Sequence, residues 1–151
     1  MTKEEFAESL NPLVDILKKV SLDKPQEAKT LLKKEAPLKS KLIQEIRKNM
    51  EQGAREGWLL PKENSGIRFG RMSKDLGGFS VDAVQMSTPG PKHRHGNGEI
   101  DLCFSIKGNP KFDGHPEGWV VYGPGSVHTP TVSDGEMLIL YFLPGGSIEF
   151  L

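Results

Sequence analysis

Residues 93–107 read His-Arg-His-Gly-Asn-Gly-Glu-Ile-Asp-Leu-Cys-Phe-Ser-Ile-Lys. From Glu99 onward polar and apolar residues alternate, which predicts a β-strand with two different faces. The apolar positions are Ile100, Leu102, Phe104 and Ile106, and the polar positions are Glu99, Asp101, Cys103 and Ser105. The polar face either meets solvent or lines a wet cavity inside the fold, and we favour the cavity.

The same stretch holds a candidate metal centre. His93 and His95 are two residues apart, a spacing that projects both imidazoles from one face of an extended strand. The Gly-Asn-Gly turn that follows can return the chain so that Glu99 reaches the same point, and His128 can complete the set from a neighbouring strand. We therefore predict one divalent transition metal bound by His93, His95, Glu99 and His128. These ligands suit zinc, iron, manganese, nickel or copper and do not choose among them.

The order of these residues resembles the two motifs of the cupin superfamily. The first is His93-x-His95-x-x-x-Glu99, and the second runs from Gly118 through Pro124 and Gly125 to His128. The chain departs from the usual pattern in the spacing of its glycines and in having Pro124 and Gly125 adjacent, which changes loop lengths but removes no ligand. The resemblance implies a cupin-type double-stranded β-helix barrel.

Four segments carry a narrower resemblance. They are Gly98-Glu-Ile-Asp-Leu-Cys-Phe, Phe112-Asp-Gly, Gly118-Trp-Val-Val-Tyr-Gly-Pro-Gly-Ser-Val-His and Met137-Leu-Ile-Leu-Tyr-Phe-Leu-Pro-Gly-Gly-Ser-Ile-Glu-Phe. These segments resemble bacterial 4-hydroxylaminobenzoate lyases of nitroaromatic breakdown and their uncharacterised cupin-like relatives. The resemblance implies a redox-neutral conversion of an aryl hydroxylamine to a catechol with loss of ammonia, and a small aromatic carboxylate as substrate.

Glycine divides the chain into two parts. Only two of the 17 glycines precede residue 58. Before that point Thr2 and Glu5 form a capping box, and apolar residues recur at helical spacing through three expected helices: one over residues 2–17, a second from about residue 23 to Pro37, and a third that ends near Gly53 or Gly57. We predict a helical segment over residues 1–57 and a barrel domain over residues 66–151, a mainly β fold with N-terminal helices (α+β). The apolar helix faces either cover one sheet of the barrel or form a homodimer interface.

Short strands separated by Gly, Pro and Asp turns are expected from residue 67 onward, as in a sandwich or barrel. The expected strands are Ile67–Met72, Phe79–Met86, Glu99–Lys107, Gly118–Tyr122, His128–Val132, Glu136–Leu143 and Ser147–Leu151.

Four further residues are candidates for the chemistry of the cavity. Asp101 shares the polar face with Glu99 and is a candidate acid and base, and Tyr141 is a candidate phenol donor. Arg68 and Arg71 lie on opposite faces of one strand, so at most one of them can point inward and bind a substrate carboxylate. Cys103 is interpreted as a small lining or core residue.

The charge balance and the cysteine count indicate which classes of partner and which compartment to expect. Lys and Arg number 20 and Asp and Glu number 20, so the chain has no basic surface for nucleic acid or for a membrane. The N-terminus lacks the apolar run of a signal peptide, and the single cysteine excludes an internal disulfide, so we expect a cytoplasmic protein.

Two alternatives to the lyase stay open. Three histidines and a glutamate also suit a cupin dioxygenase that acts on a small aromatic, and oxygen consumption would separate the two enzymes. The third hypothesis is a cupin that binds a small molecule without catalysis and uses its helices as an interaction module.

Overall fold

Four helices form the N-terminal part of the computed structural model, which describes residues 1–151. They are α1 (Lys3–Ser9), α2 (Asn11–Leu17), α3 (Pro25–Glu35) and α4 (Lys41–Glu56). The predicted capping box of Thr2 and Glu5 is present. The prediction of a single helix over residues 2–17 is wrong, because the helix is interrupted at Leu10 and two helices form. Pro12 has no N–H to donate to Glu8, whose carbonyl instead accepts the Asn11 side chain at 3.0 Å.

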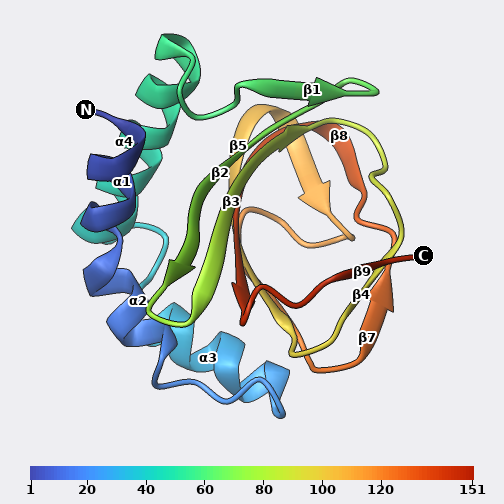
Figure 1. The fold of residues 1–151 in the computed structure, drawn as a ribbon. Helices are drawn as coiled ribbons and strands as arrows, with labels where there is room; N and C mark the ends of the chain where they lie inside the picture. Colours follow the sequence, from blue (N-terminus) through green and yellow to red (C-terminus); the bar gives the residue numbers. More distant parts are fainter.

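Nine strands follow and form two sheets. They are β1 (Lys62–Asn64), β2 (Ile67–Leu76), β3 (Phe79–Met86), β4 (His93–His95), β5 (Glu99–Phe112), β6 (Gly118–Tyr122), β7 (Ser126–His128), β8 (Val132–Pro144) and β9 (Glu149–Phe150). The larger sheet has the order β1-β2-β3-β8-β5-β6, and the smaller has the order β7-β4-β9. In Figure 1 the helices lie on one side of the larger sheet, and the smaller sheet lies on the opposite side of the barrel.

Two strand predictions are wrong. The strand expected over His128–Val132 does not form: His128 ends β7, and β8 begins at Val132 after Thr129 and Pro130. The break expected at Asn109-Pro110 does not occur either, because β5 continues to Phe112 across a register shift between Gly108 and Lys111. A bulge of this kind accommodates a proline, which cannot donate to the ladder.

The two faces of the larger sheet bury different sets of side chains. Its outer face contributes Ile100, Leu102 and Phe104 to a core of 23 buried residues shared with the helices. Its inner face contributes Cys103 and Tyr141 to a separate core of eight buried residues inside the barrel. The strand over residues 99–105 therefore separates the core beneath the helices from the barrel interior, and its alternate side chains belong to different cores.

The fold class expected from the sequence, a mainly β cupin-type barrel with helices at the N-terminus, is confirmed. The helices cover the larger sheet, which is one of the two roles proposed for their apolar faces. The division into a segment of residues 1–57 and a domain of residues 66–151 stays a prediction. None of the helices combines the length and the apolar character needed to cross a membrane.

Candidate metal centre

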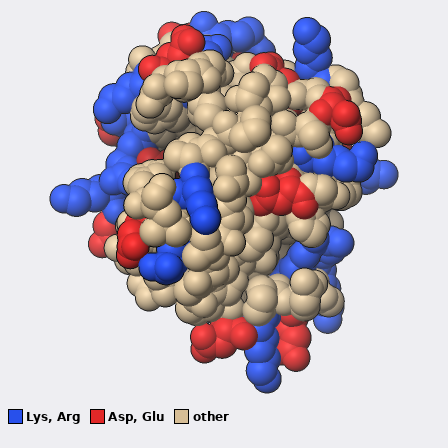
Figure 2. Space-filling view, turned by 90° about the vertical axis from the view of Figure 1, so that its right-hand side faces the viewer, with Lys and Arg blue, Asp and Glu red and all other residues tan.

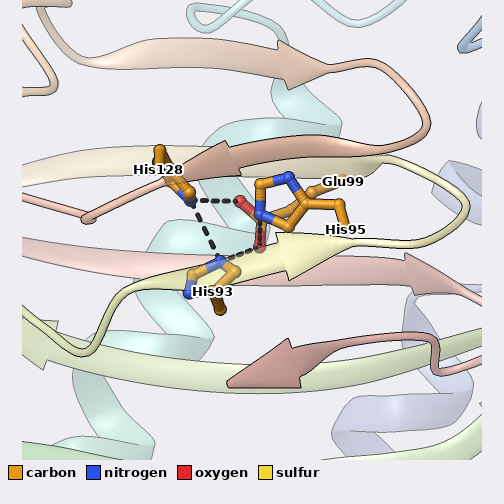
Figure 3. A group of neighbouring side chains, drawn as sticks. All are labelled: His93, His95, Glu99 and His128. Carbon is orange, nitrogen blue, oxygen red and sulfur yellow. Dashed lines mark hydrogen bonds and ion pairs between the residues drawn. The ribbon is translucent and has the colours of Figure 1, made fainter. Parts of the chain in front are cut away.

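Three strands bring the four predicted ligands together (Figure 3). His93 and His95 lie on β4 and are buried, whereas Arg94 between them is exposed. The chain then turns through Gly98, whose φ of 91° is open to glycine, and Glu99 starts β5. His128 is paired with His93 across β4 and β7. Both the strand spacing of the histidines and the return of the chain to Glu99 are as predicted.

Each imidazole is oriented by a hydrogen bond at its Nδ1 atom. Nδ1 of His93 lies 3.1 Å from the carbonyl oxygen of Pro91, and Nδ1 of His128 lies 2.6 Å from a carboxylate oxygen of Asp113. Nδ1 of His95 lies 2.8 Å from the hydroxyl of Ser126, which itself donates to the Gly123 carbonyl. Because all three partners accept, every Nδ1 carries the proton and every Nε2 has a free lone pair.

The free Nε2 atoms converge on the Glu99 carboxylate. Glu99 Oε1 lies 3.4 Å from Nε2 of His93 and 3.2 Å from Nε2 of His95, and Oε2 lies 3.6 Å from Nε2 of His128. Metal bonds of ~2.0–2.2 Å at angles between octahedral and tetrahedral place neighbouring ligand atoms roughly 2.8–3.6 Å apart. The three separations fall in this range, and the four candidate ligand atoms all lie within 4.8 Å of one another.

Two features of the cluster favour a positive charge at its centre. Nε2 of His93 and Nε2 of His128 face each other at 3.0 Å, where two lone pairs would repel. His95 Nε2 and Glu99 Oε2 are buried without a hydrogen-bond partner, which is costly in the interior of a protein. A single proton would remove the repulsion between only one pair of these atoms. A divalent cation can instead be bound by all four ligand groups together. The cluster of three histidines and one glutamate therefore fits a transition-metal site.

The two carboxyl groups at the start of β5 are in opposite charge states. Burial raises the pKa of Glu99, but in the ion-free cluster an imidazole of His93 or His95 that gains a second proton, at Nε2, hydrogen-bonds to the carboxylate; this effect outweighs burial and holds the pKa of Glu99 well below its ordinary value. Burial raises the pKa of Asp101, and the neighbouring charge of Glu99 adds to the effect. Glu99 is thus an ionised ligand, and Asp101 keeps its proton.

A cavity of about 510 Å³ opens beside the cluster, within the size range of small-molecule sites. His93 and Glu99 form part of its wall, and most of the remainder is apolar. The apolar side chains are Ile67, Phe69, Val84, Met86, Leu143 and Ile148. Phe150 of β9 also lines the cavity, with its ring centroid 6.0 Å from that of His93. Figure 2 looks onto the side that carries β4, β7 and β9, where uncharged atoms cover most of the centre.

Of the two arginines, Arg71 lines the cavity. It follows Ile67 and Phe69 in the inward alternation of β2, whereas Met72 of the opposite face joins the core beneath the helices. Arg68 shares the face of Met72 and is not a lining residue. The guanidinium of Arg71 donates from Nε and Nη2 to the two oxygens of Asp82, at 3.0 and 3.3 Å. This side-on contact leaves the Nη1–Nη2 edge free for a second carboxylate.

The two candidate catalytic residues lie across from each other on neighbouring strands, with Asp101 opposite Tyr141 in the register of β5 and β8. Tyr141 lines the cavity, and its hydroxyl has only the Met86 sulfur as a partner, at 3.8 Å. Asp101 is fully buried, is not a lining residue, and has no hydrogen-bond partner at either oxygen. Any role of Asp101 is therefore exerted through its neighbours and not by direct contact with a bound molecule.

Burial raises the pKa of the Cys103 thiol well above its ordinary value, so this residue is a packed, unreactive part of the barrel interior.

Sequence reasoning missed four polar residues around the ligands and cavity: Ser126, which accepts from His95, and Asp113, Tyr122 and Asp82. The sequence marks Asp113 only as part of an Asp-Gly turn, yet it accepts from His128 and from the Tyr122 hydroxyl. Tyr122 is paired with Glu99 across β5 and β6. Asp82 is paired with Arg71 across β2 and β3. These contacts do not follow from the sequence pattern, because Asp113 reaches its partners from a turn and the pairing of Arg71 with Asp82 depends on two register shifts between β2 and β3.

Comparison with known proteins assigns the chain to a family. The family model described as "PnbB: 4-hydroxylaminobenzoate lyase" matches residues 8–150. The chain belongs to the 4-hydroxylaminobenzoate lyase family. The match spans α2, α3 and α4 as well as the barrel.

Individual relatives are distant. A 4-hydroxylaminobenzoate lyase of Nocardioides sp. (strain LMS-CY) is 30% identical over 115 residues, which cover 67% of this chain and 68% of the relative. A second 4-hydroxylaminobenzoate lyase, of Pseudomonas putida, is 26% identical over 132 residues, and the alignment covers 74% of this chain and 75% of the relative. Among solved structures, an RmlC-like cupin protein of Ralstonia eutropha JMP134 has a TM-score of 0.46 and 14% identity, covering 62% of this chain and 66% of its own.

Proposed function

We propose that this chain is a metal-dependent lyase that converts 4-hydroxylaminobenzoate, or a close aryl hydroxylamine, to the corresponding catechol and ammonia. The overall reaction consumes one water. The hydroxyl group leaves the nitrogen as water with the electron pair of the N–O bond, and the oxygen of a water molecule adds at the adjacent ring carbon. A second water hydrolyses the resulting imine and releases the nitrogen as ammonia, so the net consumption is one water. No external oxidant or reductant is needed.

One observation carries the proposal: three Nε2 lone pairs and the Glu99 carboxylate converge at the wall of an apolar cavity that also holds Arg71. The cavity suits a flat aromatic ring, and the cluster suits an ion able to interact with a hydroxylamine. The family and the two relatives supply the substrate class, since their names specify 4-hydroxylaminobenzoate.

Arg71 binds the carboxylate of the substrate in this account. Asp82 fixes the guanidinium by its Nε edge, so the Nη1–Nη2 edge is already oriented before a ligand arrives. Arg71 stands on β2 and Glu99 on β5, with β3 and β8 between them in the sheet. The aromatic ring would span this interval between the apolar walls, with its carboxylate at Arg71 and its nitrogen towards the histidines.

Proton donation is assigned to Tyr141, and an indirect electrostatic role to Asp101. Burial raises the pKa of Tyr141, so its hydroxyl stays protonated and can donate to a group in the cavity. Asp101, which is also protonated and lies opposite Tyr141 on β5, is placed to adjust the charge around Glu99 and Tyr141 as the reaction proceeds. A divalent metal held by His93, His95, Glu99 and His128 would supply Lewis acidity at the hydroxylamine.

The experiment is anaerobic incubation of the purified chain with 4-hydroxylaminobenzoate, following the catechol by chromatography and ammonia by a coupled assay. We expect the two products in equal amounts and at the same rate with and without oxygen. Oxygen uptake matched to substrate loss would replace the lyase with the dioxygenase. Substrate that stays unchanged both with and without oxygen, in the presence of folded, metal-loaded protein, would contradict both enzymes on this substrate and leave the binding cupin.

A further inference from the structure

We propose that Asp113 is a positioning residue for the metal centre, where its carboxylate holds the His128 imidazole in the one tautomer that presents Nε2 to the ion. This inference rests on the proposed metal centre and adds to it a residue outside the ligand set. Asp113 lies in the turn after β5, 15 positions before His128.

The carboxylate of Asp113 makes three hydrogen bonds that use both oxygens. Oδ2 accepts from Nδ1 of His128 at 2.6 Å and from the Tyr122 hydroxyl. Oδ1 accepts from the backbone N–H of Thr131 at 2.8 Å, and the Asp113 N–H donates back to the Thr131 carbonyl, also at 2.8 Å. One residue thus fixes both the side chain of His128 and the backbone that follows it.

His128 is the ligand that most needs such a support. His93 and His95 are held on β4 between β7 and β9, whereas His128 ends β7, a three-residue strand at the edge of the smaller sheet. The side chain of His128 is 11% exposed, against 5% for His93 and 0% for His95. The residues on either side of it, Val127 and Thr129, are both exposed.

The partner of His128 also differs in kind from those of the other two ligands. His93 donates to a backbone carbonyl and His95 to a hydroxyl, both neutral. His128 donates to a carboxylate, which also accepts from the Tyr122 hydroxyl and from the Thr131 N–H. A charged acceptor holds the Nδ1 proton firmly and makes Nε2 a stronger donor to a metal.

The sharpest test replaces Asp113 by asparagine. The amide oxygen can still accept from the Thr131 N–H, so the turn is retained. The amide NH₂ takes the place of Oδ2 and faces the Nδ1 proton of His128 with another donor. The imidazole is then driven towards the tautomer with the proton on Nε2, which has no lone pair for the ion.

Cobalt(II) is the probe, added to the full chain after chelation and measured by its visible absorption and by competition with a chelator. We expect Asp113→Asn to lower cobalt affinity by about 10- to 100-fold and to change the absorption bands, with the melting temperature of the metal-free protein unchanged. Asp134→Asn is the matched control, because Asp134 also has a positive φ, of 60°, and has no contact with a ligand. The control should bind cobalt as the parent chain does.

A His128→Ala variant separates this inference from the proposed metal centre. If His128→Ala loses cobalt while Asp113→Asn binds it with unchanged affinity and spectrum, the centre stands and the positioning role is wrong. If His128→Ala itself keeps full affinity and an unchanged spectrum, the proposed ligand set is wrong. An equal loss in Asp113→Asn and Asp134→Asn would also overturn the inference, since the effect would then come from any lost aspartate charge.

Discussion

His95→Ala is expected to abolish ammonia release from 4-hydroxylaminobenzoate and to remove the metal from the purified protein. His95 is fully buried, and its Nε2 lies 3.2 Å from Glu99 with no other partner. Alanine removes one of four donors and leaves the Glu99 charge buried with fewer neighbours. The loss of metal affinity should exceed the roughly 10- to 100-fold cost of losing an outer hydrogen bond. Elemental analysis and the ammonia assay measure the two effects on one preparation.

The fourth histidine gives the matched control for that experiment. His115 lies in the turn after β5 and is outside the four-residue cluster. His115→Ala should keep both metal and turnover. Metal content and turnover in His95→Ala equal to those of the control would remove His95 from the site. Circular dichroism of both variants without metal checks that each is folded.

Arg71→Leu is expected to lower kcat/KM for 4-hydroxylaminobenzoate by about 10- to 100-fold, mainly through KM. A hydrogen bond to a charged group contributes about 1.5–3 kcal/mol, and each 1.4 kcal/mol corresponds to a tenfold change. The substrate carboxylate would lose the Nη1–Nη2 edge and would face Asp82, whose side chain loses its partner. Initial rates over a range of substrate concentrations separate KM from kcat.

Two controls make the Arg71 experiment specific. Arg68→Leu changes the same residue type on the same strand but on the face away from the cavity, so its kinetics should match the parent chain. Phenylhydroxylamine has no carboxylate, so Arg71→Leu should act on it as the parent chain does. An equal loss on both substrates would mean that Arg71 supports the cavity wall and does not bind the carboxylate.

The ligand set could be predicted from the sequence because it depends on local geometry. Two histidines at i and i+2 share a strand face, and the glycines before Glu99 allow the turn that brings its carboxylate back. Alternation separated the two faces of β5, but it left open whether the polar face meets solvent or lines a cavity. The residues around the ligands could not be found in this way, because Asp113, Tyr122 and Ser126 reach the histidines through strand registers and turns that only the folded chain defines.

Arg68 and Arg71 also show what the sequence pattern could not predict. Alternation placed Arg68 and Arg71 on opposite faces, but it did not say which face pointed inward. That depends on Met72, which packs beneath the helices and so turns Arg71 to the cavity. For Asp101 the sequence predicted the correct face of the strand. It could not predict that Asp101 is completely buried away from the cavity surface, because this depends on the packing around β5 and β8.

The most direct measurement is reconstitution of the metal-free chain with increasing amounts of a divalent metal, following ammonia release anaerobically. The protein is purified without an affinity tag, so that no added histidines bind the ion. The account predicts negligible activity without metal and a linear rise that reaches a plateau at one ion per chain. Full turnover by protein that elemental analysis shows to be free of transition metal would contradict a metal-dependent lyase at His93, His95, Glu99 and His128.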